Sequence, residues 1–255
     1  MTAERNIKLL LAFDGTHYAG WQKQKAEKTI QGVLEDALSV MTGSHACLHG
    51  AGRTDAGVHA LGMAANFTTG AAIPCRGFVK GLNSLLPGDI RVLAAAEMAA
   101  GFHARRSARA KTYWYNLTSG PVQLPTERLY SAHTFAPLDC AAVEKGLAQV
   151  TGTHDFAGFE AAGSRDPDRP GRGAVRTVFT ANIEEIGPNR SYRFVISGDG
   201  FLRHMVRNIV GTLLEVGQGR RDPSEVGAIL AAGDRSAAGP TAPARGLFLK
   251  EVAYD

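Results

Sequence analysis

The sequence predicts an α+β protein made of two similar halves with mostly antiparallel sheets. Hydrophobic residues make up 44% of the 255 residues and charged residues 20%, which suits a folded protein with a sizeable core. Predicted strands and helices alternate in a similar order twice along the chain, and a dense basic stretch at 105–111 lies between the two series. We therefore expect an N-terminal half over residues 1–105 and a C-terminal half over residues 106–255.

The first half has the order strand, helix, strand, strand, helix, strand. Apolar residues alternate over 7–13, which indicates a strand that Asp14 and Gly15 end. Thr29 suits the N-cap of a helix, because apolar residues follow at helical spacing over 30–41. The remaining elements are strands at 46–49 and 63–68, a helix at 78–86 and a strand at 90–95.

The second half repeats the mixture of strands and helices with longer loops. Its predicted elements are strands at 112–117, 175–183, 192–197 and 247–252, and helices at 141–150, 205–217 and 223–231. Residues 161–173 carry many charges and two prolines without an apolar period, so we expect a mobile loop there. A turn at 187–189 should join two of the strands.

The composition narrows the class of protein. The net charge of +4 and the pI near 9.0 hint at an anionic partner. Cys47, Cys75 and Cys140 are scattered, so we expect neither a disulfide framework nor a structural zinc site, and we expect a reducing compartment. Because we find no apolar leader and no run of 18 apolar residues, the sequence predicts a soluble cytoplasmic protein without a membrane span.

A glycine-rich loop at 50–59 has the most unusual pattern, Gly-Ala-Gly-Arg-Thr-Asp-Ala-Gly-Val-His. Two interpretations stay open from the residues alone. Asp55 either caps a turn, or it is presented to a ligand with Arg53 beside it to contact a phosphate. The loop lacks the Gly-Lys-Ser/Thr ending of a phosphate loop, and no second acid lies nearby as a glycosidase needs. His59 is expected to order the loop.

The loop resembles the signature of the TruA family of tRNA pseudouridine synthases, which reads Gly-Arg-Thr-Asp-Ala-Gly-Val-His and here occupies 52–59. Four further blocks resemble motifs of that family and occur in order along the chain, at 13–22, 83–90, 102–105 and 200–211. The resemblance implies a pseudouridine synthase fold, with two ferredoxin-like (RRM-like) halves around a central cleft. It also implies an isomerase that needs neither cofactor nor metal.

The resemblance implies roles for three residues. Asp55 would be the nucleophile, Tyr113 would stack on the target base and serve in proton transfer, and Arg207 would pair with Asp55. An arginine keeps a carboxylate ionised when a closing pocket removes water. On pattern alone, the preferred interpretation of Tyr113 is a core aromatic like Tyr115, and that of Arg207 and Arg203 is solvated arginines beside an apolar helix face.

The predicted partner is RNA. Arg53, Arg105, Lys111 and Arg203 are candidate phosphate contacts. The resemblance implies the tRNA anticodon stem-loop as substrate, with uridines 38, 39 and 40 as targets, and it implies a homodimer. Arg53 is expected to fill the space that the flipped uridine leaves. Two other classes stay open: a non-catalytic RRM-like RNA-binding protein, which needs no aspartate among glycines, and a carboxylate glycosidase, which needs a second acid.

Overall fold

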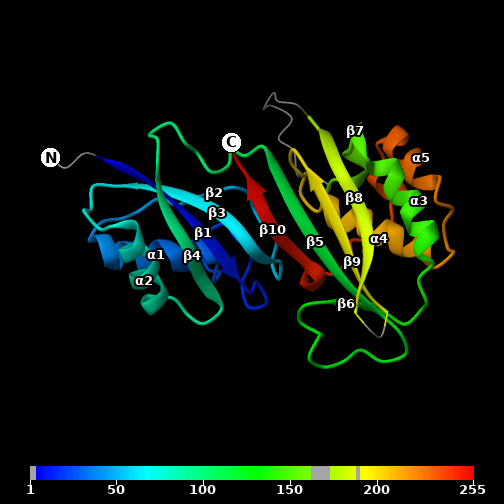
Figure 1. The fold of residues 1–255 in the computed structure, drawn as a ribbon. Helices are drawn as coiled ribbons and strands as arrows, with labels where there is room; N and C mark the ends of the chain where they lie inside the picture. The colour runs from blue at the N-terminus through cyan, green and yellow to red at the C-terminus, as the bar shows by residue number, and fades with distance from the viewer. Residues whose placement is uncertain (1–3, 162–172, 188–189) are drawn as a thin grey trace. The chain divides into compact units, whose positions relative to one another are not determined.

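The computed structural model describes residues 4–161, 173–187 and 190–255, and the chain divides into two compact units. Unit 1 comprises Met1–Arg109 and Phe248–Asp255, and unit 2 comprises Ala110–Leu247 (Figure 1). The described residues form five α-helices and mostly antiparallel strands, which confirms the predicted α+β class. The loop predicted at 161–173 and the turn predicted at 187–189 lie largely outside the described residues.

The sheet of unit 1 is built around its first strand. β1 (Arg5–Phe13) pairs antiparallel with β3 (His59–Thr69) on one side and with β4 (Ile90–Met98) on the other. The short β2 (His49–Gly50) pairs antiparallel with β3. The resulting order, β4-β1-β3-β2, is that of a ferredoxin-like βαββαβ unit (Figure 1).

Two helices cover one face of this sheet. α1 (Ile30–Thr42) begins at Thr29, whose hydroxyl accepts a hydrogen bond from the Gly32 amide, as the sequence predicts. α2 (Cys75–Leu85) packs on the sheet through Phe78, whose ring meets Phe67 of β3 edge-to-face at 5.4 Å. Alternate side chains of β1 are fully buried in this core, namely Ile7, Leu9 and Leu11.

The last strand, β10 (Leu247–Ala253), differs in placement from the sequence expectation. The sequence grouped 247–252 with the second half, whereas Phe248 and Leu249 pair in parallel with the start of β3, and residues from Phe248 onward belong to unit 1. Gly62 permits the approach, since a Cβ there would lie 2.5 Å from the Lys250 carbonyl oxygen. Because β3 and β10 are distant in sequence, no local sequence pattern predicts that they pair.

The sheet of unit 2 has the order β5-β9-β8-β7, and each neighbouring pair is antiparallel. Its strands are β5 (Ala110–Ser119), β9 (Ser191–Gly198), β8 (Val175–Gly187) and β7 (Gly152–Asp155). β6 (Ala132–Thr134) runs parallel to the end of β5. The sequence missed β6 and β7 because three or four residues are too few to show an alternation.

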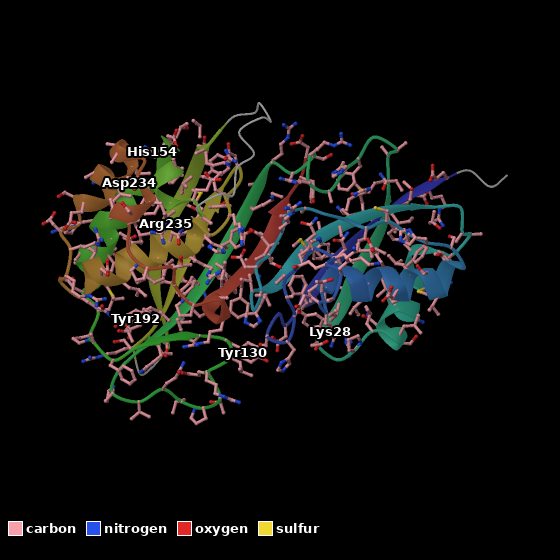
Figure 2. All side chains as sticks on the ribbon, turned by 180° about the vertical axis from the view of Figure 1, so that it is seen from behind. Lys28, Tyr130, His154, Tyr192, Asp234 and Arg235 are labelled. Carbon is pink, nitrogen blue, oxygen red and sulfur yellow. The ribbon has the colours of Figure 1, made fainter. Side chains whose placement is uncertain are left out.

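Three helices belong to unit 2: α3 (Cys140–Val150), α4 (Met205–Gly217) and α5 (Glu225–Ala232). Most of α4 is buried, including the polar Asn208. The Asn208 amide donates to the Phe159 carbonyl at 2.8 Å, and its oxygen accepts from Arg235, which Figure 2 labels. Across the described residues, no helix has both the length and the apolar character required to cross a membrane.

Candidate active site

The glycine-rich loop with Asp55 lies between β2 and β3 in unit 1. Asp55 is half-buried, Arg53 is exposed and Thr54 is buried. The backbone reverses directly after Asp55, where the Val58 amide donates to the Asp55 carbonyl at 3.2 Å. Gly57 makes this turn possible because its φ of 76° is left-handed.

The segment that joins β1 to α1 holds this loop through backbone hydrogen bonds. The Trp21 amide donates to the Thr54 carbonyl at 3.1 Å, and the Gly57 amide donates to the Tyr18 carbonyl at 3.3 Å. Gly20 lies against the loop with a φ of 94°, and a Cβ there would be 2.5 Å from the Thr54 oxygen. The sequence blocks at 13–22 and 52–59 are therefore packed together and joined by backbone hydrogen bonds.

Further close contacts hold the blocks at 13–22 and 52–59 together. The Trp21 ring is buried, and a Cβ on Gly50 would lie 2.5 Å from it. A Cβ on Gly15 would lie 2.0 Å from the Val58 carbonyl oxygen. These glycines allow two backbone segments to pack almost without intervening side chains. Such packing leaves the backbone beside Asp55 little freedom to move.

His59 orders the base of the loop, as the sequence predicts. Its ring is 1% exposed and stacks on Phe248 at 4.6 Å. Its Nδ1 lies 3.1 Å from both the Gly15 amide and the Asp14 carboxylate, and one nitrogen cannot accept from the first while it donates to the second. We assign Nδ1 as the acceptor, because the Gly15 amide can only donate and Asp14 already accepts from Thr16.

The block at 83–90 supports the same segment. The Tyr18 hydroxyl donates to Asp89 at 2.6 Å, and the Asp14 amide donates to the Asp89 carbonyl at 2.9 Å. Burial and this carboxylate raise the pKa of Tyr18, so its hydroxyl keeps its proton. Lys28, labelled in Figure 2, lies over the Tyr18 ring at 4.6 Å. The block at 83–90 is thus linked to the Asp55 loop through Tyr18, which bonds Asp89 with its hydroxyl and Gly57 with its carbonyl.

The basic stretch begins in unit 1 next to the block at 102–105. The Ala104 amide donates to Asn66 of β3, and the Ala104 carbonyl accepts from the Tyr254 hydroxyl at 2.7 Å. The Arg105 amide donates to Nδ1 of His103, and burial with a neighbouring arginine lowers the pKa of that histidine. The backbone is therefore anchored while the Arg105 side chain is exposed.

Tyr113 lies in β5 of unit 2, opposite Ile196 of β9. It is 8% exposed, and its ring meets Phe201 edge-to-face at 5.1 Å. Tyr115, two residues on, is fully buried and donates to the Pro243 carbonyl at 3.0 Å. Burial raises the pKa of Tyr115. Its place in the core is as expected, while Tyr113 keeps a small exposed area.

Arg207 lies in the first turn of α4 and is half-buried. Its Nε donates to the Ala242 carbonyl at 2.8 Å, and the Ala242 amide donates to the Arg207 carbonyl at 3.1 Å. Gly211, one turn later, lets this chain segment lie on the helix, since a Cβ there would be 1.7 Å from the Pro240 carbonyl oxygen. The segment at 239–242 is not predicted from the sequence. The available signal was a glycine inside a strongly periodic helix.

The predicted site residues fall on both units. Unit 1 carries Asp55, Arg53 and Arg105, and unit 2 carries Tyr113, Lys111, Arg203 and Arg207. Arg203 is exposed and Lys111 is half-buried. Within the described ranges, no group of three or more His, Cys, Asp or Glu is arranged to hold a metal ion. The ion pair between Asp55 and Arg207 remains a prediction.

A family model and the similar proteins found by comparison all indicate the same family. A family model described as tRNA pseudouridine synthase matches residues 10–105 and 147–255. The tRNA pseudouridine synthase A 1 of Desulfotalea psychrophila is 52% identical over 251 residues, which cover 98% of this chain and 100% of that protein. The tRNA pseudouridine synthases A of Lacticaseibacillus casei and Myxococcus xanthus are 44% and 43% identical, over 98% and 97% of this chain and 99% and 91% of theirs. The chain therefore belongs to the tRNA pseudouridine synthase family.

Proposed function

We propose that this protein isomerises uridine to pseudouridine in the anticodon arm of tRNA, with Asp55 as the nucleophile. The observation that carries the proposal is the fixed setting of Asp55. Asp55 is half-buried in a loop whose backbone is hydrogen-bonded at two points, the Thr54 carbonyl and the Gly57 amide, to the segment before α1. A rigid support of this kind suits a group that must meet one atom of a substrate.

The proposed reaction changes no oxidation state and consumes no water. The bond between ribose C1′ and uracil N1 breaks, the uracil turns, and a bond forms between C1′ and C5. The C5 proton leaves, and N1 gains a proton. Asp55 attacks C1′ or the base, or it removes a ribose proton, and it is regenerated at the end. The Tyr113 hydroxyl, a water molecule and Asp55 itself are the candidate acceptors for the C5 proton.

The target uridine must leave its stack to reach the carboxylate of the half-buried Asp55, at a cost of a few kcal/mol. Arg53 is exposed and lies two residues before Asp55, so we propose that it fills the vacated space. Tyr113 would stack on the flipped base, which its small exposed area permits. Arg207 would hold the charge of Asp55.

The substrate range and assembly complete the proposal. We propose uridines 38, 39 and 40 as targets, read by the shape of the anticodon stem-loop. We also propose a homodimer that acts in the cytoplasm. For this dimer we propose an interface that includes Val122 and Phe135 of unit 2, which are 75% and 76% exposed.

The test uses tRNA transcript labelled with tritium at uridine C5, since pseudouridine formation releases that tritium. We expect release by the wild type and none above background by Asp55→Asn, with tRNA binding retained. Asp36→Asn, which removes the same charge from an exposed position on α1, serves as the matched control and should stay active.

Two outcomes would contradict the proposal in different ways. A wild-type protein that binds tRNA and releases no tritium would support the RRM-like binding protein instead. Full activity of Asp55→Asn would leave the synthase activity intact but remove Asp55 as its nucleophile.

A further inference from the structure

Thr54 precedes Asp55 directly and carries an unsatisfied hydroxyl. The residue is 8% exposed, and its Oγ1 is buried with no hydrogen-bond partner among the residues that the structure describes. Its backbone, in contrast, is engaged, because the Thr54 carbonyl accepts from the Trp21 amide. The unpaired atom therefore belongs to a residue that the fold holds firmly.

Among the described residues, the hydroxyl of every other buried threonine has a hydrogen-bond partner. Hydroxyl hydrogen bonds are present at Thr29, Thr69, Thr118, Thr134 and Thr212. A buried hydroxyl without a partner costs free energy, and valine would fill the same space without that cost. The exception at Thr54 thus indicates a hydroxyl that is kept for a partner absent from the free protein.

The loop cannot easily supply that partner by shifting its backbone. Gly20 lies against the Thr54 carbonyl, where even an added Cβ would be only 2.5 Å away. Rotation about χ1 is the available freedom, because it moves Oγ1 from one staggered position on Cβ to another. Thr54 retains a small exposed area, so this rotation can present the hydroxyl to a molecule that enters beside Asp55.

We infer that Thr54 is a positioning residue whose hydroxyl hydrogen-bonds the target uridine nucleotide when that nucleotide occupies the site beside Asp55. This inference rests on the proposed role of Asp55. A uridine nucleotide offers carbonyl oxygens, an imide N–H and a ribose hydroxyl, and a threonine hydroxyl can donate to or accept from these groups. The interaction is made only in the RNA-bound enzyme, so it contributes to turnover and not to folding.

The test compares Thr54→Val, which keeps the shape and removes the hydroxyl, with Thr54→Ser, which keeps the hydroxyl. For Thr54→Val we expect kcat in the tritium-release assay to fall at least roughly 10-fold, the loss of one hydrogen bond. The Kd for tRNA should change much less, because phosphate contacts dominate RNA affinity. The melting temperature of the free protein should stay the same or rise. Thr54→Ser should recover most of the activity.

Thr29→Val is the matched control, since Thr29 is buried in the same unit and its hydroxyl is bonded to the Gly32 amide. It should lower the melting temperature. If Thr54→Val lowers the melting temperature as Thr29→Val does, the hydroxyl is structural and the inference is overturned. Wild-type kcat in Thr54→Val also overturns it. If Thr54→Val has wild-type kcat while Asp55→Asn is inactive in the same assay, only the role of Thr54 is removed. If Asp55→Asn is active, the proposed nucleophile itself is removed.

Discussion

Gly20 shows how one residue far from Asp55 in sequence controls the backbone beside it. Its φ of 94° lies in the left-handed region, and its missing side chain leaves room for the Thr54 carbonyl. Gly43, at the end of α1, has a similar φ of 69° but no atom within 4 Å of an added Cβ. Alanine variants at the two positions therefore distinguish the cost of a left-handed backbone from the cost of direct atomic overlap.

We predict that Gly20→Ala lowers the free energy of unfolding by about 2–5 kcal/mol, from a left-handed alanine plus overlap with a carbonyl group. Gly43→Ala should cost only about 1–2 kcal/mol. Urea unfolding measures both changes. Gly20→Ala should also reduce tritium release below the value expected from its folded fraction, because the Asp55 loop must move. Equal losses of stability in the two variants would contradict this prediction, because they would show that the overlap of the new Cβ with the Thr54 carbonyl costs no free energy.

At Arg207, the guanidinium carries both a structural bond and the proposed catalytic role. Because Nε donates to the Ala242 carbonyl, Arg207→Ala removes a packing contact as well as a charge. We predict that Arg207→Ala lowers kcat by about 100-fold or more, the scale for loss of one electrostatic partner, with a modest change in tRNA binding. Arg203→Ala, an exposed arginine four residues earlier, is the control and should affect binding more than turnover. Parallel losses of kcat and tRNA affinity in Arg207→Ala would contradict the ion-pair role.

At the scale of elements, α4 and the segment at 239–242 behave as one part. The helix is periodic enough for the sequence to predict its full length, 205–217. The segment has no pattern of its own, yet it packs on α4 at Gly211 and receives the Arg207 side chain. Thr212 adds to this contact, since its hydroxyl accepts from the Gly239 amide at 2.9 Å.

We predict opposite effects for two helical glycines. Gly211→Ala should cost about 3 kcal/mol or more, because a Cβ 1.7 Å from the Pro240 carbonyl forces backbone apart. In α5, Gly227→Ala meets only the end of the Gln149 side chain, which can move, so higher helix propensity should stabilise the protein by up to about 1 kcal/mol. Thermal unfolding distinguishes the two. Stabilisation by both variants would mean that the segment does not depend on Gly211.

The elements that the sequence predicts well are those with repeated local signals. α1 has a threonine cap and apolar spacing, and β1 alternates along its whole length, so both were predicted close to their observed bounds. The predicted strand at 46–49 is observed as only two residues, His49–Gly50, because pairing with β3 determines its extent. β10 shows the same dependence, since its partner lies in the other half of the sequence.

At the scale of the whole molecule, charge should govern the encounter with tRNA. The chain has 28 basic and 24 acidic residues, and Arg105 is an exposed member of the basic stretch. Arg109, in the same stretch, forms an ion pair with Asp255 at 2.7 Å. Replacing either arginine by a neutral residue changes the net charge by the same amount. Comparing the two variants therefore distinguishes a local phosphate contact from a general effect of charge.

We predict that Arg105→Gln lowers the steepness of the plot of log tRNA affinity against log salt concentration by about 0.7–0.9, the contribution of one phosphate contact. Its kcat at saturating tRNA should be unchanged. Arg109→Gln should alter the slope much less. Filter binding at several salt concentrations provides the measurement. An unchanged slope in Arg105→Gln would remove Arg105 from the RNA surface.

The sequence by itself determined the α+β class, the main helices and strands, and the choice of Asp55 as the residue to test. Local periodicity, capping residues and an ordered set of motifs are written in the chain, so no coordinates are needed to find them. Only the tertiary structure decided that β10 joins the first sheet and that the segment before α1 braces the Asp55 loop. It also decided that the Thr54 hydroxyl lacks a partner within the described part of the chain. Each of these depends on contacts between residues distant in sequence, and such contacts are fixed by packing and hydrogen bonding of the folded chain rather than by local pattern.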